Sequence, residues 1–213
     1  MTATPRADRT PKKTVFLMRH GETASDGVKR YIGQTDLPLS PFGRKQAEAW
    51  QRFFRNTPLA AIYASDLSRT RETAAIVAAE RDIPLIAEPD LREIHMGSWE
   101  NLAFASLRKE NPEAFRERGE QIDTYRPPGG ESFRDLQRRA VAAFNRAVDQ
   151  TPGSLLIVAH AGVNRVILCH ILAMPLRHIF RLAQYHACLN TLISADDGFR
   201  VVGLNRSAAG DIA

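Results

Sequence analysis

Apolar and polar segments alternate along this chain in a way that predicts strands separated by helices. Short apolar runs at residues 14–18, 59–64 and 154–159 are typical of buried strands, and residues 83–87 predict a shorter one. Apolar side chains recur at helical spacing in several segments. These segments predict helices over residues 41–56, 67–81, 101–110, 133–148 and 163–174, with a further helix after Pro112.

Turn and capping residues sharpen several of these boundaries. Ser40 and Pro41 form an N-cap followed by proline at the first helical position, and the apolar helix over 163–174 should end before Pro175. Residues 189–195 and 199–204 predict two strands joined across Asp196-Asp197-Gly198, which is a hairpin signal. The final hairpin implies one antiparallel strand. The pattern therefore predicts an α/β fold: a three-layer αβα sandwich with a mainly parallel sheet.

The length of the chain predicts a single domain, and its charge is unevenly distributed. The chain has 213 residues, and its net charge of +5 lies largely in a Thr/Pro/Arg-rich N-terminus. We expect a disordered basic tail over residues 1–13, a single domain over 14–205, and a second disordered tail over 206–213. Within the domain, the irregular segment 94–130 predicts an insertion that covers one end of the sheet as a lid. Two cysteines, Cys169 and Cys188, are too few for a disulfide scaffold.

The composition also bears on partners and location. The chain has no apolar run of membrane-spanning length and no apolar signal segment near its start, so we expect a cytoplasmic protein without membrane contact. Nucleic acid is not an expected partner, because the charge excess lies in the tail and basic residues do not interleave with aromatic ones. A homodimer stays open.

Candidate chemistry gathers where the predicted strands end. Arg19 and His20 follow the first strand, Arg69 lies just after the second, and His160 follows the strand at 154–159. Glu93 lies in the loop region expected to cover the same edge. Ligands of α/β sheets bind at the carboxyl ends of the strands. Arginine forks match phosphate oxygens, and a neutral histidine is a nucleophile toward phosphorus. The set predicts a site for phosphoryl chemistry.

Two glycines add to this interpretation. Gly21 and Gly162 would let the backbone approach a ligand, and a helix that begins near Gly162 would offer N–H donors to an anion. A leaving alkoxide needs a proton, which a carboxylic acid can supply. We therefore expect a small phosphate ester as the partner molecule.

Four motifs in order resemble the histidine phosphatase superfamily, in the branch that includes cofactor-dependent phosphoglycerate mutases. The resemblance covers roughly residues 14–195, and its motifs are Arg19-His-Gly-Glu-Thr23, Ser65-Asp-Leu-Ser-Arg69-Thr-Arg-Glu-Thr-Ala74, Leu91-Arg-Glu93-Ile-His-Met-Gly97-Ser-Trp99-Glu100 and Val158-Ala-His160-Ala-Gly162. Each motif falls at a predicted strand end. The resemblance implies the phosphoglycerate mutase-like fold.

The resemblance also implies roles. His20 would be the nucleophile that becomes a phosphohistidine, and Arg19, Arg69 and His160 would hold the phosphoryl oxygens. Glu93 would protonate the leaving group and then activate water. The same resemblance implies that the phosphate-binding group includes Arg19, Gly21, Gly33, Arg69, Ala161 and Gly162. No cofactor or metal is implied.

Within the superfamily, the closest likeness is to alpha-ribazole phosphatases and similar small phosphatases. Three segments carry it, namely residues 32–40, 126–132 and 188–190. Three positions depart from the family pattern: Asp26 stands where Asn is frequent, Asn101 where Gly is frequent, and Asn164 where an aliphatic residue is commoner. An acid at Asp26 is unhelpful to a phosphate unless it points away or binds a substrate hydroxyl or base. A left-handed turn at Asn101 would survive, because Asn tolerates that conformation.

The leading hypothesis is a metal-independent phosphomonoesterase, and two rivals remain. A phosphoglycerate mutase would need cations for a second phosphate, and a binding module on the same fold would lack a catalytic residue, yet none is missing. His170, His178 and His186 recur at a spacing that fits no compact zinc pattern. His95 is open between lid structure and substrate contact. The basic side chains of the segment predict a solvated helical face, with substrate steering as the minority alternative, at Arg108, Lys109, Arg116 and Arg118.

Overall fold

The computed structural model describes residues 13–208. The tail predicted over residues 1–13 lies outside this range except for Lys13, whose ammonium group donates to the carbonyl oxygens of Val148 and Thr151. Most of the tail predicted over 206–213 lies outside it as well, and Arg206 ends the last strand. Within residues 13–208, no helix combines the length and the apolar composition needed to cross a membrane.

Residues 13–208 form six strands and six α-helices in the order that the hydrophobic pattern predicts. The strands are β1 (Thr14–Arg19), β2 (Ala61–Ala64), β3 (Leu85–Ala87), β4 (Leu155–Ala159), β5 (Leu189–Ala195) and β6 (Gly198–Arg206). The helices are α1 (Pro41–Phe54), α2 (Ser68–Ala78), α3 (Phe104–Glu110), α4 (Pro112–Glu120), α5 (Phe133–Gln150) and α6 (Ala161–Ile171). Three short 3-10 turns lie at Pro89–Leu91, Gly97–Trp99 and Leu176–Arg181.

One mixed sheet runs through the molecule in the order β3-β2-β4-β1-β5-β6. Strands β1 to β4 pair in parallel, whereas β5 is antiparallel to both of its neighbours, β1 and β6. The predicted α/β class with one antiparallel strand is therefore confirmed. In the parallel pairing of β1 with β4, Arg19 lies opposite Ala159, so both strands end at the same level.

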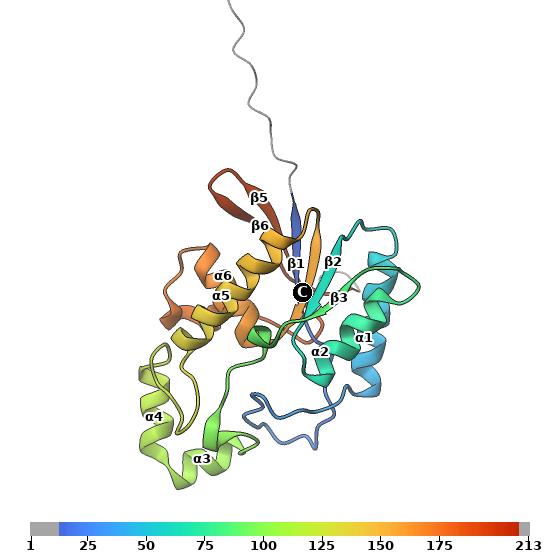
Figure 1. The fold of residues 1–213 in the computed structure, drawn as a ribbon. Coiled ribbons are helices and arrows are strands. Elements are labelled where there is room, and N and C mark those ends of the chain that lie inside the picture. Colours follow the sequence, from blue (N-terminus) through green and yellow to red (C-terminus); the bar gives the residue numbers. More distant parts are fainter. Residues whose placement is uncertain (1–12, 209–213) are drawn as a thin grey trace, which may run out of the picture.

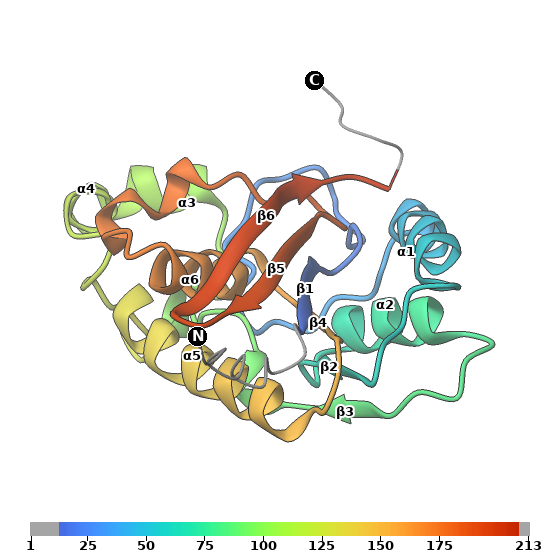
Figure 2. The ribbon, with the colours of Figure 1, turned by 90° about the horizontal axis from the view of Figure 1, so that it is seen from above.

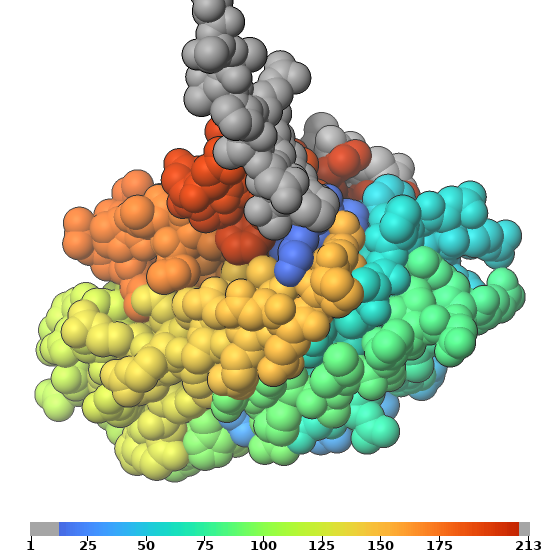
Figure 3. Space-filling model, turned by 45° about the horizontal axis from the view of Figure 1, so that its top comes forward, coloured from blue at the N-terminus to red at the C-terminus, as the bar shows by residue number. Residues whose placement is uncertain are grey.

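Helices cover both faces of the sheet, which gives the predicted three layers (Figure 2). Strand residues alternate between the faces because the side-chain period of a strand is two. Leu17 and Ile157 pack with α5 and α6, whereas Met18 and Val158 pack with α1 and α2. Seen from outside, the exposed side of α5 forms a band across one face of the molecule, coloured yellow to orange (Figure 3).

Local sequence accounts for where several elements begin and end. Ser40 caps α1 as predicted, because its hydroxyl oxygen accepts from the N–H of Gly43 at 3.0 Å. Ser132 and Asp135 form a capping box at the start of α5. Several boundaries differ from the predictions: β2 begins at Ala61 rather than at residue 59, α3 begins at Phe104 rather than at residue 101, and α6 spans Ala161–Ile171 rather than 163–174.

The segment predicted as a lid, residues 94–130, holds α3 and α4. Figure 1 shows these helices and the loop after β1 at the same end of the sheet. Trp99 is buried there between Tyr31 and Tyr125. The prediction of a solvated basic face is wrong for Arg118, whose guanidinium lies over the rings of Tyr31 and Phe133 at 5.3 and 5.9 Å. Planar guanidinium groups stack readily on aromatic rings.

Candidate active site

Two neighbouring strand ends bring His20 and His160 together. The N–H of His20 donates to the carbonyl of Ala159 at 3.0 Å, so the chain leaves β1 in register with β4. The ring centroids of His20 and His160 lie 5.1 Å apart. Both side chains are buried, with His20 at 6% and His160 at 0% exposure. The pairing predicted from two separate motifs is thus present.

One hydrogen bond determines which ring nitrogen of His20 carries the proton. Its Nδ1 lies 2.7 Å from the carbonyl oxygen of Gly21, which can only accept, so Nδ1 carries the proton. Burial lowers the pKa of His20 well below 6.5, and the adjacent His160, Arg19 and Arg69 lower the pKa further. The imidazole is therefore neutral at physiological pH, and its Nε2 keeps a lone pair.

Contacts with Arg69 and Ser65 place the proton of His160 on Nε2, the ring nitrogen opposite to that in His20. The guanidinium Nε of Arg69 donates to Nδ1 of His160 at 3.3 Å, so the proton of His160 resides on Nε2 and is donated to Ser65 Oγ at 2.8 Å. Burial, followed by the charges of Arg69 and Arg19, lowers the pKa of His160 well below 6.5. The two NH2 groups of Arg69 donate to the carbonyls of Thr35 and Gly33, each at 2.8 Å.

Arg19 is held on the other side of His20 by residues that the motifs do not include. Its Nη1 donates to the carbonyl of Gln184 at 2.8 Å and its Nη2 to Nε2 of His186 at 2.7 Å. Its Nε is buried and has no partner among residues 13–208. Burial lowers the pKa of Arg19 to about 10, so the group stays cationic at neutral pH. A buried cation with an unpaired donor suits an incoming anion.

His186 is a site residue that the sequence pattern missed. Its ring lies 5.7 Å from that of His20. Burial and the neighbouring Arg19 lower the pKa of His186 to about 4, so the ring is neutral and accepts the arginine hydrogen bond. The sequence places His186 only in an eight-residue histidine spacing. Among the described residues, no group of three or more His, Cys, Asp or Glu side chains is placed to hold a metal ion.

Glu93 reaches the site from the loop after β3 and meets the start of α6. Its Oε2 accepts from the N–H of Gly162 at 2.9 Å, and its Oε1 accepts from the N–H of Ile94 at 2.9 Å. A Cβ at Gly162 would lie 2.3 Å from Glu93 Oε1, so only glycine permits this approach. Arg139 anchors the backbone of Glu93 by donating to its carbonyl at 2.9 Å. Sequence reasoning did not identify Arg139.

Glu100 is poorly suited to proton donation. Its two carboxylate oxygens accept from the backbone N–H groups of Gln34, Thr35 and Met96 and from the hydroxyl of Thr35. Burial raises the pKa of Glu100, but these hydrogen bonds outweigh burial, so the pKa falls below its usual range. Glu100 thereby holds the loop whose carbonyls bind Arg69.

Two of the glycines expected at the site are confined by close packing against other parts of the chain. The N–H of Gly21 donates to Thr73 Oγ1 at 3.1 Å, and a Cβ at Gly21 would lie 2.5 Å from the carbonyl oxygen of Gly43. Close packing on α1 therefore accounts for a glycine at position 21, and the approach of its backbone to a ligand stays a prediction. Gly33 is likewise confined by Glu100, and its carbonyl binds Arg69. Ala161 is the first residue of α6, where N–H groups lack intrahelical partners.

These side chains line one cleft of about 890 Å³. Its lining includes Arg19, His20, Arg69, Glu93, His160 and His186, together with Glu22, Ser40, Pro41 and the loop residues Thr23, Ala24, Ser25, Gly27, Val28, Lys29, Arg30 and Ile32. The five residues predicted as catalytic thus share one cleft. The cations Lys29 and Arg30 were not predicted there, and the basic lid residues Arg108, Lys109, Arg116 and Arg118 do not line it.

The structure shows how the three positions that depart from the family pattern, and His95, fit into the fold. Asn101 adopts a φ of 61° and its N–H donates to the carbonyl of Tyr31 at 2.8 Å, so the turn survives without glycine as predicted. Asn164 is buried and its amide donates to Gln184 Oε1 at 3.2 Å. Asp26 forms an ion pair with Arg30 at 2.8 Å. His95 is half-buried, and its Nδ1 lies 3.1 Å from the carbonyl oxygen of Gly129.

Two histidines, two arginines and an acid meet at one edge of the sheet. Such a set of side chains is suited to phosphoryl groups. The family model of the histidine phosphatase superfamily (branch 1) matches residues 15–207, and the chain belongs to that superfamily.

Relatives of known sequence or structure agree with this assignment. The "probable phosphoglycerate mutase GpmB" of Yersinia pestis is 32% identical over 200 residues, which cover 93% of each chain. The crystal structure of YhfR of Bacillus stearothermophilus is 34% identical, with a TM-score of 0.82 over 89% of this chain and 95% of its own. A mycobacterial glucosyl-3-phosphoglycerate phosphatase, solved with VO3, is 26% identical with a TM-score of 0.80 over 92% of this chain and all of its own. The alpha-ribazole phosphatase of Shigella flexneri, at 24% identity and a TM-score of 0.84, shares the fold.

Proposed function

We propose that this protein is a metal-independent phosphomonoesterase that acts on a small phosphorylated metabolite through a phosphohistidine at His20. The observation that carries the proposal is the pairing of a neutral His20, protonated on Nδ1, with the cationic Arg19 and Arg69 in one cleft. Nε2 is the nitrogen left with a lone pair. Fixed cations placed around a transferring phosphoryl group stabilise its charge without reorganisation.

The proposed reaction has two steps. His20 Nε2 attacks phosphorus while the bond to the leaving oxygen breaks, and the carboxyl group of Glu93 gives that oxygen its proton. Water then attacks the phosphohistidine, Glu93 takes the proton from water, and the P–N bond breaks to release inorganic phosphate. His160, whose two ring nitrogens bond Ser65 and Arg69, positions the Arg69 guanidinium beside His20.

A mutase is the rival reaction, and the distribution of charge favours hydrolysis. A mutase must bind a second phosphate and keep water from the phosphohistidine. Beyond Arg19 and Arg69, the cations that line the cleft are Lys29 and Arg30, and Arg30 is already paired with Asp26. The name of the Yersinia relative keeps the mutase as the second candidate. Alpha-ribazole phosphate is a candidate substrate on the motif resemblance.

The test supplies 3-phosphoglycerate with 2,3-bisphosphoglycerate, and a panel of other phosphate esters, in excess EDTA. We expect release of inorganic phosphate without interconversion of the 2- and 3-isomers, and inhibition by vanadate. Exchange of the isomers much faster than phosphate release would establish the mutase. Complete loss of activity in EDTA, restored by a divalent ion, would contradict the metal-independent mechanism.

A further inference from the structure

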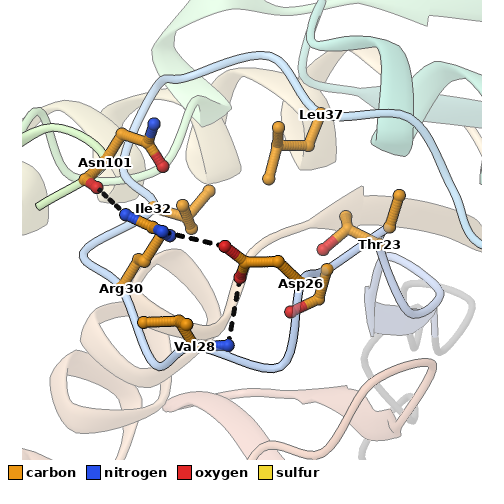
Figure 4. Close-up of a pocket in the computed structure, with 9 residues that line it drawn as sticks. Thr23, Asp26, Val28, Arg30, Ile32, Leu37 and Asn101 are labelled. Atoms are coloured by element: carbon orange, nitrogen blue, oxygen red, sulfur yellow. Dashed lines mark hydrogen bonds and ion pairs between the residues drawn. The ribbon is translucent and has the colours of Figure 1, made fainter. Parts of the chain in front are cut away.

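A second hollow opens beside the catalytic cleft and is hereafter called the side pocket. It has a volume of about 280 Å³ and is lined by Thr23, Ala24, Ser25, Asp26, Val28, Arg30, Ile32, Leu37 and Asn101 (Figure 4). Six of these residues also line the cleft that contains His20. Asp26, Leu37 and Asn101 line only the side pocket. We propose that the side pocket binds the leaving group of the ester, and that this group is uncharged and rich in hydroxyls, such as a sugar or ribosyl group.

This inference rests on the proposed phosphatase function, and the size of the pocket supports it. Sites for whole small ligands occupy roughly 300–1,000 Å³. The cleft of about 890 Å³ lies within that range, whereas the side pocket of about 280 Å³ lies just below it. The side pocket therefore suits one part of a substrate whose phosphate lies at His20.

Asp26 gives the side pocket its capacity to accept hydrogen bonds. One carboxylate oxygen accepts from the N–H of Val28 at 3.0 Å and the other from Arg30 at 2.8 Å. The side chain is still 55% exposed, and a carboxylate offers about four acceptor positions, so about two remain for a ligand. The hydrogen bond from Arg30 lowers the pKa of Asp26, which keeps the group ionised. Substrate hydroxyls are the donors that match such a group.

Arg30 already has a carboxylate and a carbonyl oxygen as partners in this pocket. Its Nη2 donates to Asp26 and its Nη1 donates to the carbonyl of Asn101 at 3.0 Å. The charge of Arg30 is balanced by Asp26, and an anionic leaving group would meet the exposed carboxylate. Two like charges in contact repel each other even near the protein surface. The pair therefore favours an uncharged leaving group over a glycerate or a second phosphate.

The remaining walls suit the ring of a sugar. Figure 4 shows Leu37, Ile32 and Thr23 around the space next to Asp26, whose carboxylate oxygens face Arg30 and the N–H of Val28. Leu37 and Ile32 supply apolar surface for the ring carbons. The Asn101 amide and the Thr23 hydroxyl supply both donors and acceptors. A mixture of this kind recognises hydroxyls, which donate and accept at once.

The test compares two esters that differ only in ring hydroxyls. Ribose 5-phosphate carries them, and tetrahydrofurfuryl phosphate has the ring without them. We expect the wild-type protein to prefer ribose 5-phosphate by about tenfold in kcat/KM, since a hydrogen bond to a charged group contributes roughly that factor or more. Asp26→Asn should remove most of this preference. Asp82→Asn, a matched change at an exposed aspartate outside both hollows, should keep it.

Nitrophenyl phosphate separates failure of the subsite from failure of the proposed function. If nitrophenyl phosphate is hydrolysed but the wild type shows no preference for ribose 5-phosphate, or Asp26→Asn retains that preference, the subsite is overturned and the phosphatase stands. A wild-type preference for 3-phosphoglycerate over ribose 5-phosphate would also overturn it. If none of these esters is hydrolysed, the phosphatase proposal itself fails.

Discussion

His20 and His160 face each other with opposite tautomers, and each tautomer is set by a group that can act in only one way. A carbonyl oxygen must accept, so Nδ1 of His20 carries its proton, and an arginine must donate, so Nδ1 of His160 does not. The side chain of His20 is thereby prepared to attack, whereas that of His160 bridges Ser65 and Arg69 and so positions the arginine. This division of roles depends on Gly21 and Arg69 as much as on the histidines.

At the scale of single residues, Glu93 gives a sharp prediction. Glu93→Gln keeps the shape of the side chain but cannot supply a proton, so hydrolysis of alkyl esters should slow by roughly 10²-fold or more. Nitrophenyl phosphate should lose far less, because nitrophenolate leaves with little protonation. Steady-state kcat/KM for both esters measures this difference. Glu113→Gln, at an exposed position in α4, is the matched control and should alter neither value. Equal losses on both esters in Glu93→Gln would point to another donor.

Sequence alone could name the residues at strand ends but not those that hold them. Arg19, His20 and His160 follow apolar runs, so their meeting is a consequence of parallel strands. His186 and Arg139 act through contacts with residues 167 and 46 positions away, respectively, and no local pattern records such contacts. The packing of Gly21 could not be predicted for a related reason, because its close neighbour is Gly43 on α1.

At the scale of elements, the start of α6 and the loop that carries Glu93 depend on each other. Gly162→Ala would place a Cβ 2.3 Å from Glu93 Oε1, and the carboxylate is the flexible partner that must move. We expect kcat/KM for alkyl esters to fall by about tenfold or more, because a small misplacement of a catalytic group is costly. Gly119→Ala is the matched control, since a Cβ there meets nothing within 4 Å. Unchanged kinetics in Gly162→Ala would show that Glu93 does not need this contact.

The elements themselves were largely predictable because their hydrophobic periods are clear. Helix α5 buries Leu136, Ala140 and Phe144 at helical spacing, and β4 is buried throughout. Strand β3 has a weaker hydrophobic signal, because it is only three residues long and these residues are exposed at the edge of the sheet. The loop from Gly33 to Thr35 could not be predicted, because Glu100 and Arg69 determine its path from elsewhere in the chain.

At the scale of the whole molecule, burying two neutral imidazoles makes stability depend on pH. The folded-state pKa values of His20 and His160 lie well below the unfolded value near 6.5. The unfolded chain therefore binds more protons below pH 6.5, and stability is lost as the pH falls through that value. Each histidine should remove about 1.4 kcal/mol from the free energy of unfolding between about pH 7.5 and 5.5.

Urea unfolding at these two pH values measures the effect. In His160→Gln the loss between the two pH values should be smaller than in the wild type by about 1.4 kcal/mol, because one titrating group is absent. Carboxylates titrate mainly below this range and contribute little to the difference. Identical pH dependence in the two proteins would mean that His160 is protonated as readily in the fold as in the unfolded chain.

The most direct test of the central claim is to stop the reaction during turnover and locate the phosphate. Protein quenched and kept at alkaline pH should carry one acid-labile phosphoryl group, which mass spectrometry of peptides should assign to His20. His20→Ala should lack this group and should lose turnover by roughly 10⁴-fold or more, since the substitution removes the proposed nucleophile. Turnover by His20→Ala close to that of the wild type, or phosphate on another residue, would contradict the account.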